Sequence, residues 1–315
     1  MRRLWLSLVI ILAALVVLAA CSEDTKKETD ENAGDTPLHV VTSFTIIKDM
    51  VQEIGGDRVD VHNLVPTGTD PHDYEPLPED IKKATDADVL FYNGLNLEGG
   101  DQGWFFKLVD SVGQSEDVIY EVAEGVEPMY LTSADGKEEE MNPHAFLDPV
   151  VGIQMAENVR DALKEVDPDY QDLYDDHASD YIAQLEAIDA EYEEKIADIP
   201  EENRILVTSE RAYQYMADRY GLKEGYIWAI DTEENGTPEQ ITSLVEFVDE
   251  NSPPALFVES NVDQRPMETV SQETGVEIAA ELYSDEIGKP GEEVDTYMKF
   301  LKYNIDMIHK GLAEE

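Results

Sequence analysis

Two histidines, His72 and His144, each stand directly after a proline in an acid-rich turn, TGTDPHDYEP and MNPHAFLDP. A proline restricts the backbone, so each imidazole is held by a stiff local turn. Two carboxylates, Glu210 and Asp285, occupy comparable places in the second half of the chain. Two imidazoles and two carboxylates that converge on one point would bind a divalent cation through mixed nitrogen and oxygen ligands.

Each of these four residues follows a run that is typical of a β-strand. In open parallel sheets, ligands bind at the carboxyl ends of the strands, so the pattern predicts one site built from both halves of the chain. Taken singly, each residue also has a structural interpretation as a surface turn, a helix cap or a first-turn acid. The preceding runs are 58–65 for His72, 117–122 for His144, 204–208 for Glu210 and 276–282 for Asp285.

The remaining four histidines have no such setting at a strand end. They lie within regular elements, and we assign them to structure. They are His39, His62, His177 and His309.

Short β-branched runs alternate with amphipathic stretches from Pro37 onward, which predicts an α/β fold with mainly parallel sheets. The remaining predicted strands are 38–42, 88–92, 225–230 and 255–259. Predicted helices follow Ser43 and lie at 78–86, 104–113, 149–166, 211–220, 238–250, 266–274 and 292–311.

The longest helical pattern covers residues 167–199. Its apolar and aromatic residues recur at three- and four-residue steps until Pro200. At about 1.5 Å per residue, such a helix exceeds roughly 40 Å and is longer than one small domain. We therefore expect two βα lobes, 37–166 and 200–315, joined by this one rigid backbone helix.

The N-terminus has the features of a secreted lipoprotein. A basic start and an apolar stretch predict a signal peptide over residues 1–20. The sequence Leu18-Ala19-Ala20-Cys21 resembles a lipobox, and Cys21 is the chain's only cysteine. We expect a lipid on Cys21, a flexible tether over 21–36, and a location on the extracytoplasmic face of the cell membrane. An uncleaved membrane anchor is the alternative.

The chain is strongly acidic, with 22 basic and 71 acidic residues and a formal net charge of −49. Such a surface repels phosphate backbones, so nucleic acid is excluded as a partner. It also repels anionic lipid, so membrane attachment must depend on the anchor. The acidity could attract cations, but we favour its ordinary role in solubility.

Several motifs resemble the metal-receptor lipoproteins of bacterial ABC importers, in the same order along the chain. They are TGTDPHDYEPLPEDIKKATDADVLFYNGLNLE, NPHAFLDP, VTSERAYQYMADRYGL, TEENGTPEQI, FVESNVDQRPMETVSQETGV and LYSDEIG. The resemblance implies two lobes joined by a backbone helix, and metal ligands at His72, His144, Glu210 and Asp285. It also implies delivery of the metal to an ABC permease with its ATPase, by a receptor that we expect to be monomeric.

The third ligand helps to separate metals within that family, because zinc-type members usually have histidine there. This chain has Glu210, and residues 121–142 contain no histidine. Phe146 replaces a tryptophan that is common in the manganese-type branch. Carboxylate oxygens suit a hard ion such as Mn²⁺, although affinity for a fixed ligand set rises from Mn²⁺ to Zn²⁺. We expect Mn²⁺ as the cargo, with Zn²⁺ or Fe²⁺ as alternatives.

Two other classes of function fit the sequence less well. A metallohydrolase would need an open coordination position and a nearby base, and the sequence has no His-Glu-x-x-His motif. We therefore expect no enzyme. A surface adhesin or structural lipoprotein would differ from a receptor by the absence of a permease and an ATPase encoded beside it.

Overall fold

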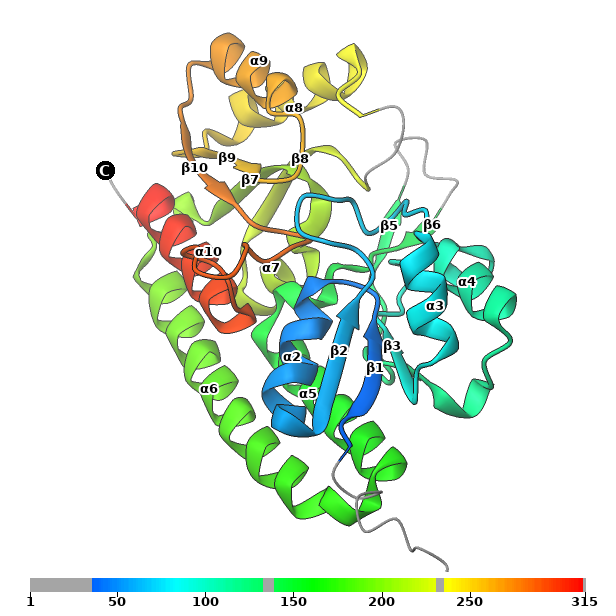
Figure 1. Cartoon of the computed structure of the whole chain (residues 1–315). Helices are drawn as coiled ribbons and strands as arrows, with labels where there is room; N and C mark the ends of the chain where they lie inside the picture. The colour runs from blue at the N-terminus through cyan, green and yellow to red at the C-terminus, as the bar shows by residue number, and fades with distance from the viewer. Residues whose placement is uncertain (1–35, 133–138, 231–234, 314–315) are drawn as a thin grey trace, which may run out of the picture. The chain divides into compact units, whose positions relative to one another are not determined.

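The protein is described from a computed structural model, which covers residues 36–132, 139–230 and 235–313 (Figure 1). The described residues from Pro37 onward form one compact unit. The predicted signal peptide, Cys21 and the tether as far as residue 35 lie outside the described residues. Within the described ranges, no helix combines the length and the apolar character that a bilayer crossing requires.

The first half contains a four-stranded parallel sheet with the strand order β2-β1-β3-β4. Its central strand carries Val40 and Val41, which are both buried, as expected for a parallel strand covered on two faces. The strands are β1 (Leu38–Thr42), β2 (Val59–Asn63), β3 (Val89–Tyr92) and β4 (Ile119–Glu121). The helices are α2 (Thr45–Gly55), α3 (Pro78–Thr85), α4 (Trp104–Val112) and α5 (Pro149–Val166).

A short antiparallel pair, β5 (Tyr130–Thr132) and β6 (Glu139–Met141), was not predicted from the sequence. Each strand has only three residues, too few to show an alternating pattern. The pair leads directly into the turn that carries His144.

The long helix α6 (Gln171–Asp198) has 28 residues and follows a single 3₁₀ turn at Pro168–Tyr170. The predicted range 167–199 is therefore nearly correct, although its first turn is tighter than an α-helix. Helix α6 packs against α5 and α2 from the first half and against α10 from the second half. Its buried face is formed by Tyr174, Ala178, Tyr181, Leu185, Ile188, Tyr192 and Ile196.

The second half has two parallel strand pairs, β7–β8 and β9–β10. The strands are β7 (Ile205–Glu210), β8 (Lys223–Trp228), β9 (Leu256–Glu259) and β10 (Ile278–Leu282). The helices are α7 (Gln214–Tyr220), α8 (Pro238–Asn251), α9 (Arg265–Thr274) and α10 (Tyr297–Ala313). The predicted fold class is confirmed: the sheets are mainly parallel and one long helix connects the two halves. The lobe boundaries at 166/167 and 199/200 stay a prediction.

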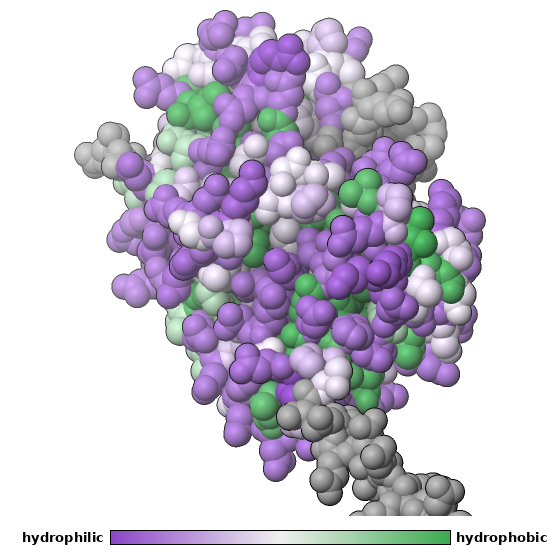
Figure 2. Space-filling model, viewed as in Figure 1, coloured by the Kyte–Doolittle hydropathy of each residue, from purple (hydrophilic) through white to green (hydrophobic). Residues whose placement is uncertain are grey.

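The largest hydrophobic core is shared by both halves, because it continues from β1 and α2 through α6 into α10. A second core lies around β7, β8 and β9. The outer face seen in Figure 2 is mostly hydrophilic, with hydrophobic residues in small, separate groups. That surface agrees with the acidic composition.

Candidate metal-binding site

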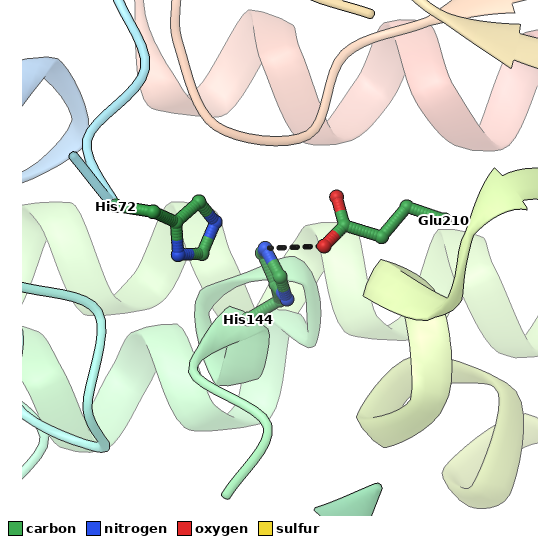
Figure 3. A group of neighbouring side chains, drawn as sticks. All are labelled: His72, His144 and Glu210. Carbon is green, nitrogen blue, oxygen red and sulfur yellow. Dashed lines mark ion pairs between the residues drawn. The ribbon is translucent and has the colours of Figure 1, made fainter. Parts of the chain in front are cut away.

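The structure brings His72, His144 and Glu210 together, with one possible ligand atom of each within 4.8 Å of the others. His72 lies in the loop between β2 and α3, and His144 begins a 3₁₀ turn, His144–Leu147. Glu210 is the last residue of β7, whereas the sequence had placed it two residues beyond the strand. Figure 3 shows the two imidazoles and the glutamate carboxylate facing one another.

Asp285, the fourth predicted ligand, joins the same group from the loop after β10. Its Oδ1 lies 3.0 Å from Nε2 of His144 and 3.8 Å from Nε2 of His72. Nε2 of His144 is in turn 4.0 Å from Oε1 of Glu210, the pair joined by the dashed line in Figure 3. Three of the four residues predicted from the sequence therefore form one mutual group, and Asp285 lies beside its two histidines.

The group is buried, and its polar atoms are poorly satisfied. His144 and Glu210 are 0% exposed and Asp285 is 3% exposed. Nε2 of His72, Nε2 of His144 and Oδ1 of Asp285 have no hydrogen-bond partner in the part of the chain described. Buried polar atoms without partners are rare and unfavourable, and a cation between them would remove that cost.

Electrostatics in the group favour a neutral imidazole at His72 and an ionised carboxylate at Asp285. Burial lowers the pKa of His72, because the charged imidazolium is poorly solvated there. Burial alone would raise the pKa of Asp285, but His144 and His72 outweigh it and hold that pKa well below its usual range. Neutral imidazoles and ionised carboxylates are the forms that bind metal.

His144 is oriented by Asn142, which the sequence analysis did not identify as functional. Nδ2 of Asn142 donates to the carbonyl oxygen of Arg211 at 3.0 Å and to Oε1 of Gln214 at 3.0 Å. Its Oδ1 must therefore face His144, where it accepts from the backbone N–H at 3.1 Å and from Nδ1 at 2.8 Å. Nδ1 therefore donates to Asn142, and Nε2 is the ring nitrogen that faces the other predicted ligands.

The loop of His72 is fixed by a different set of contacts. Its backbone N–H donates to Oδ1 of Asp70 at 2.7 Å, and the indole N–H of Trp104 donates to the carbonyl of Pro71 at 2.8 Å. Two residues beyond His72, the Tyr74 hydroxyl donates to the buried carboxylate of Asp80 at 2.7 Å. The stiffness predicted for this turn therefore has tertiary as well as local causes.

The other histidines make contacts away from the site. His62 meets Asp80 at 2.7 Å, His177 meets the carbonyl of Ile54 at 3.0 Å, and His309 meets Asp198 at 2.8 Å. The exposed His39 lies 3.5 Å from Asp60. None of these contacts involves a predicted ligand, in agreement with the structural roles assigned from the sequence.

The chain is similar to proteins named for metal transport over most of its length. The family model described as the periplasmic component A of the zinc-uptake complex, ZnuA, matches residues 40–311. The manganese ABC transporter substrate-binding lipoprotein scaA of Streptococcus gordonii is 46% identical over 308 residues, which is 98% of each chain. The iron ABC transporter substrate-binding lipoprotein MtsA of Streptococcus pyogenes serotype M1 is 43% identical over 314 residues, 99% of each chain.

Among solved structures, the periplasmic zinc-binding protein TroA from Treponema pallidum has a similar fold, with a TM-score of 0.80 and 27% identity. The similarity covers 89% of this chain and 100% of that chain. The matching family and the relatives are transport components rather than enzymes, as the sequence analysis expected. The chain belongs to the family of metal-binding, substrate-binding lipoproteins of bacterial ABC transporters.

Proposed function

We propose that this chain is a lipid-anchored extracytoplasmic receptor that binds Mn²⁺ and delivers it to an ABC permease. Its ligands would be His72, His144, Glu210 and Asp285. The observation that carries the proposal is a mutual group of His72, His144 and Glu210, with Asp285 beside the two histidines. Within the described residues, three of the facing atoms have no hydrogen-bond partner. Each half supplies one pair, so the ion would hold the two halves together.

The ligand chemistry supports a divalent ion. Two carboxylates would neutralise its charge, while two neutral imidazoles would add directional bonds. The set has no sulfur and half of its donors are oxygen, which suits Mn²⁺ better than a site of nitrogen and sulfur would. Fe²⁺ and Zn²⁺ are the alternatives, since relatives and similar structures are named for iron and zinc.

Membrane attachment in this proposal depends on the lipid at Cys21. The relatives are named lipoproteins, which supports an anchor at the end of the chain. The partners are the permease and the ATPase of the same importer, and the receptor would act as a monomer.

Elemental analysis tests the metal directly. The full-length chain, purified in a mild detergent from cells grown with balanced Mn²⁺, Fe²⁺ and Zn²⁺, should carry about one Mn²⁺ per chain. Replacing His144, Glu210 or Asp285 with alanine should abolish that metal content. If the bound metal is mainly iron or zinc, the chain is still a metal receptor but its cargo is not Mn²⁺. If each of the three variants keeps its bound metal, the proposed site is refuted.

A further inference from the structure

The last residue of strand β9 and the loop that follows it contact both carboxylate ligands of the second half. This segment supplies no predicted ligand. Glu259, the last residue of β9, is 0% exposed. Its Oε2 accepts the backbone N–H of Ser209 at 3.1 Å, and its Oε1 accepts that of Glu210 at 3.0 Å. Both carboxylate oxygens thus hold two successive N–H groups at the end of β7, where the ligand Glu210 begins its turn.

Two residues farther along, Asn261 makes the equivalent contact with the other ligand. Its Nδ2 donates to Oδ2 of Asp285 at 2.9 Å, and Ser284 Oγ donates to the same oxygen at 2.6 Å. Oδ2 is therefore occupied by two donors, while Oδ1 faces the histidines at 3.0 and 3.8 Å. Asn261 and Ser284 together leave Oδ1 as the oxygen that Asp285 presents to the site.

From these contacts we infer that Glu259 and Asn261 are positioning residues for the metal site. The inference depends on the proposed function, because it concerns how the same ion is held. Glu259 fixes the backbone that carries Glu210, and Asn261 fixes the rotation of the Asp285 carboxylate. Since β9 and β10 are neighbouring parallel strands, one three-residue segment, Glu259–Asn261, sets the relative placement of both ligands.

The chemistry favours positioning over direct coordination. Both oxygens of Glu259 are directed at the backbone N–H groups of Ser209 and Glu210. Asp285, in contrast, directs Oδ1 at both histidines. Outer-shell partners of this kind orient the ligands and tune affinity, and their loss typically weakens metal binding by about 10- to 100-fold. An amide at position 259 would place an N–H₂ donor against a backbone N–H, so the Glu259→Gln substitution is sharply disruptive to this contact.

The test compares Glu259→Gln and Asn261→Ala with the wild-type chain and with Asp49→Asn. Asp49 is a matched control, because it is also a buried carboxylate that accepts a backbone N–H, from Tyr297 at 3.0 Å. Mn²⁺ affinity is measured on the full-length chain by titration calorimetry, and the bound ion is examined by EPR. Measurements at pH 8 keep the glutamate ionised, since burial raises the pKa of Glu259 to about 7.

Both test variants should bind Mn²⁺ about 10- to 100-fold more weakly, with an altered EPR spectrum, while Asp49→Asn matches the wild type. A merely structural role would lower the thermal midpoint of the metal-free chain but leave affinity and EPR spectrum unchanged, and that result would overturn the inference. If Glu259→Gln does not fold, the Asn261→Ala variant still tests the inference, because residue 261 is partly exposed and its substitution should not prevent folding. Failure of the proposed function is distinguishable, because the wild-type chain would then bind no Mn²⁺.

Discussion

Replacing Asn142 with alanine should weaken both the fold and the metal site, by different amounts. The Asn142 side chain is fully buried and makes four hydrogen bonds, two with His144 and one each with Arg211 and Gln214. At about 1 kcal/mol net for each bond, the free energy of unfolding should fall by about 3 to 4 kcal/mol.

Metal affinity should fall for a separate reason. Without Oδ1 of Asn142, nothing holds the proton on Nδ1 of His144 or directs Nε2 toward the other ligands. Loss of such an outer-shell partner predicts binding weaker by about 10- to 100-fold, or about 1.4 to 2.8 kcal/mol. Urea denaturation of the metal-free chain gives the first quantity, and Mn²⁺ titration calorimetry gives the second.

Asn158→Ala is a suitable control, since Nδ2 of Asn158 donates to the carbonyls of Val122 and Glu124 at 2.9 and 3.0 Å and touches no predicted ligand. It should lower stability and leave affinity unchanged. If Asn142→Ala also loses stability without losing affinity, the orientation of His144 does not depend on Asn142.

Three further predictions concern charge and pH. Glu210→His should shift preference toward Zn²⁺ by exchanging a hard oxygen for nitrogen, and an unchanged Mn²⁺/Zn²⁺ affinity ratio in competition titrations would contradict it. Because burial lowers the pKa of His72, Mn²⁺ affinity should stay constant from pH 8 to about 6.5. At lower pH it should fall as protons displace the metal, and titration calorimetry across this pH range measures the change. Burial raises the pKa of Asp49 from 3.8 to about 6, so the native state keeps a proton that the unfolded chain loses. The free energy of unfolding should therefore fall by about 2 kcal/mol as pH rises from about 4 to 6. Asp49→Asn should remove that decrease, as urea denaturation at the two pH values would show.

Much of the fold could be predicted because its signals are local. The β-branched run at 38–42 and the helical spacing after Pro168 reproduce β1 and most of α6. The β5–β6 pair could not be predicted, because three-residue strands carry no period and are formed by their mutual pairing. Glu210 was placed beyond its strand for a related reason: β7 continues to Glu210 through its pairing with Trp228 of β8, which the sequence does not reveal.

The candidate ligands could also be predicted, since each stands in a short motif at a strand end. Their positioning partners could not, because those contacts join distant parts of the chain. Glu259 is 49 residues from Glu210, and Asn261 is 24 residues from Asp285. Both lie in the quoted motif FVESNVD, but only the folded chain brings them to a ligand. Asn142, Asp70 and Ser284 each lie within two residues of the ligand they contact, so a local analysis could have found these partners.

Other long-range contacts would limit how the site could release an ion. Near each ligand turn, a hydrogen bond crosses to the other half: Tyr297 donates from its hydroxyl to the carbonyl of Phe146 at 2.5 Å, and the backbone N–H of Ile287 donates to Oγ1 of Thr45 at 3.1 Å. A wide hinge motion would break both and would also split the core that α6 and α10 share. We therefore expect the halves to move little, and release to require rearrangement of the ligand loops themselves.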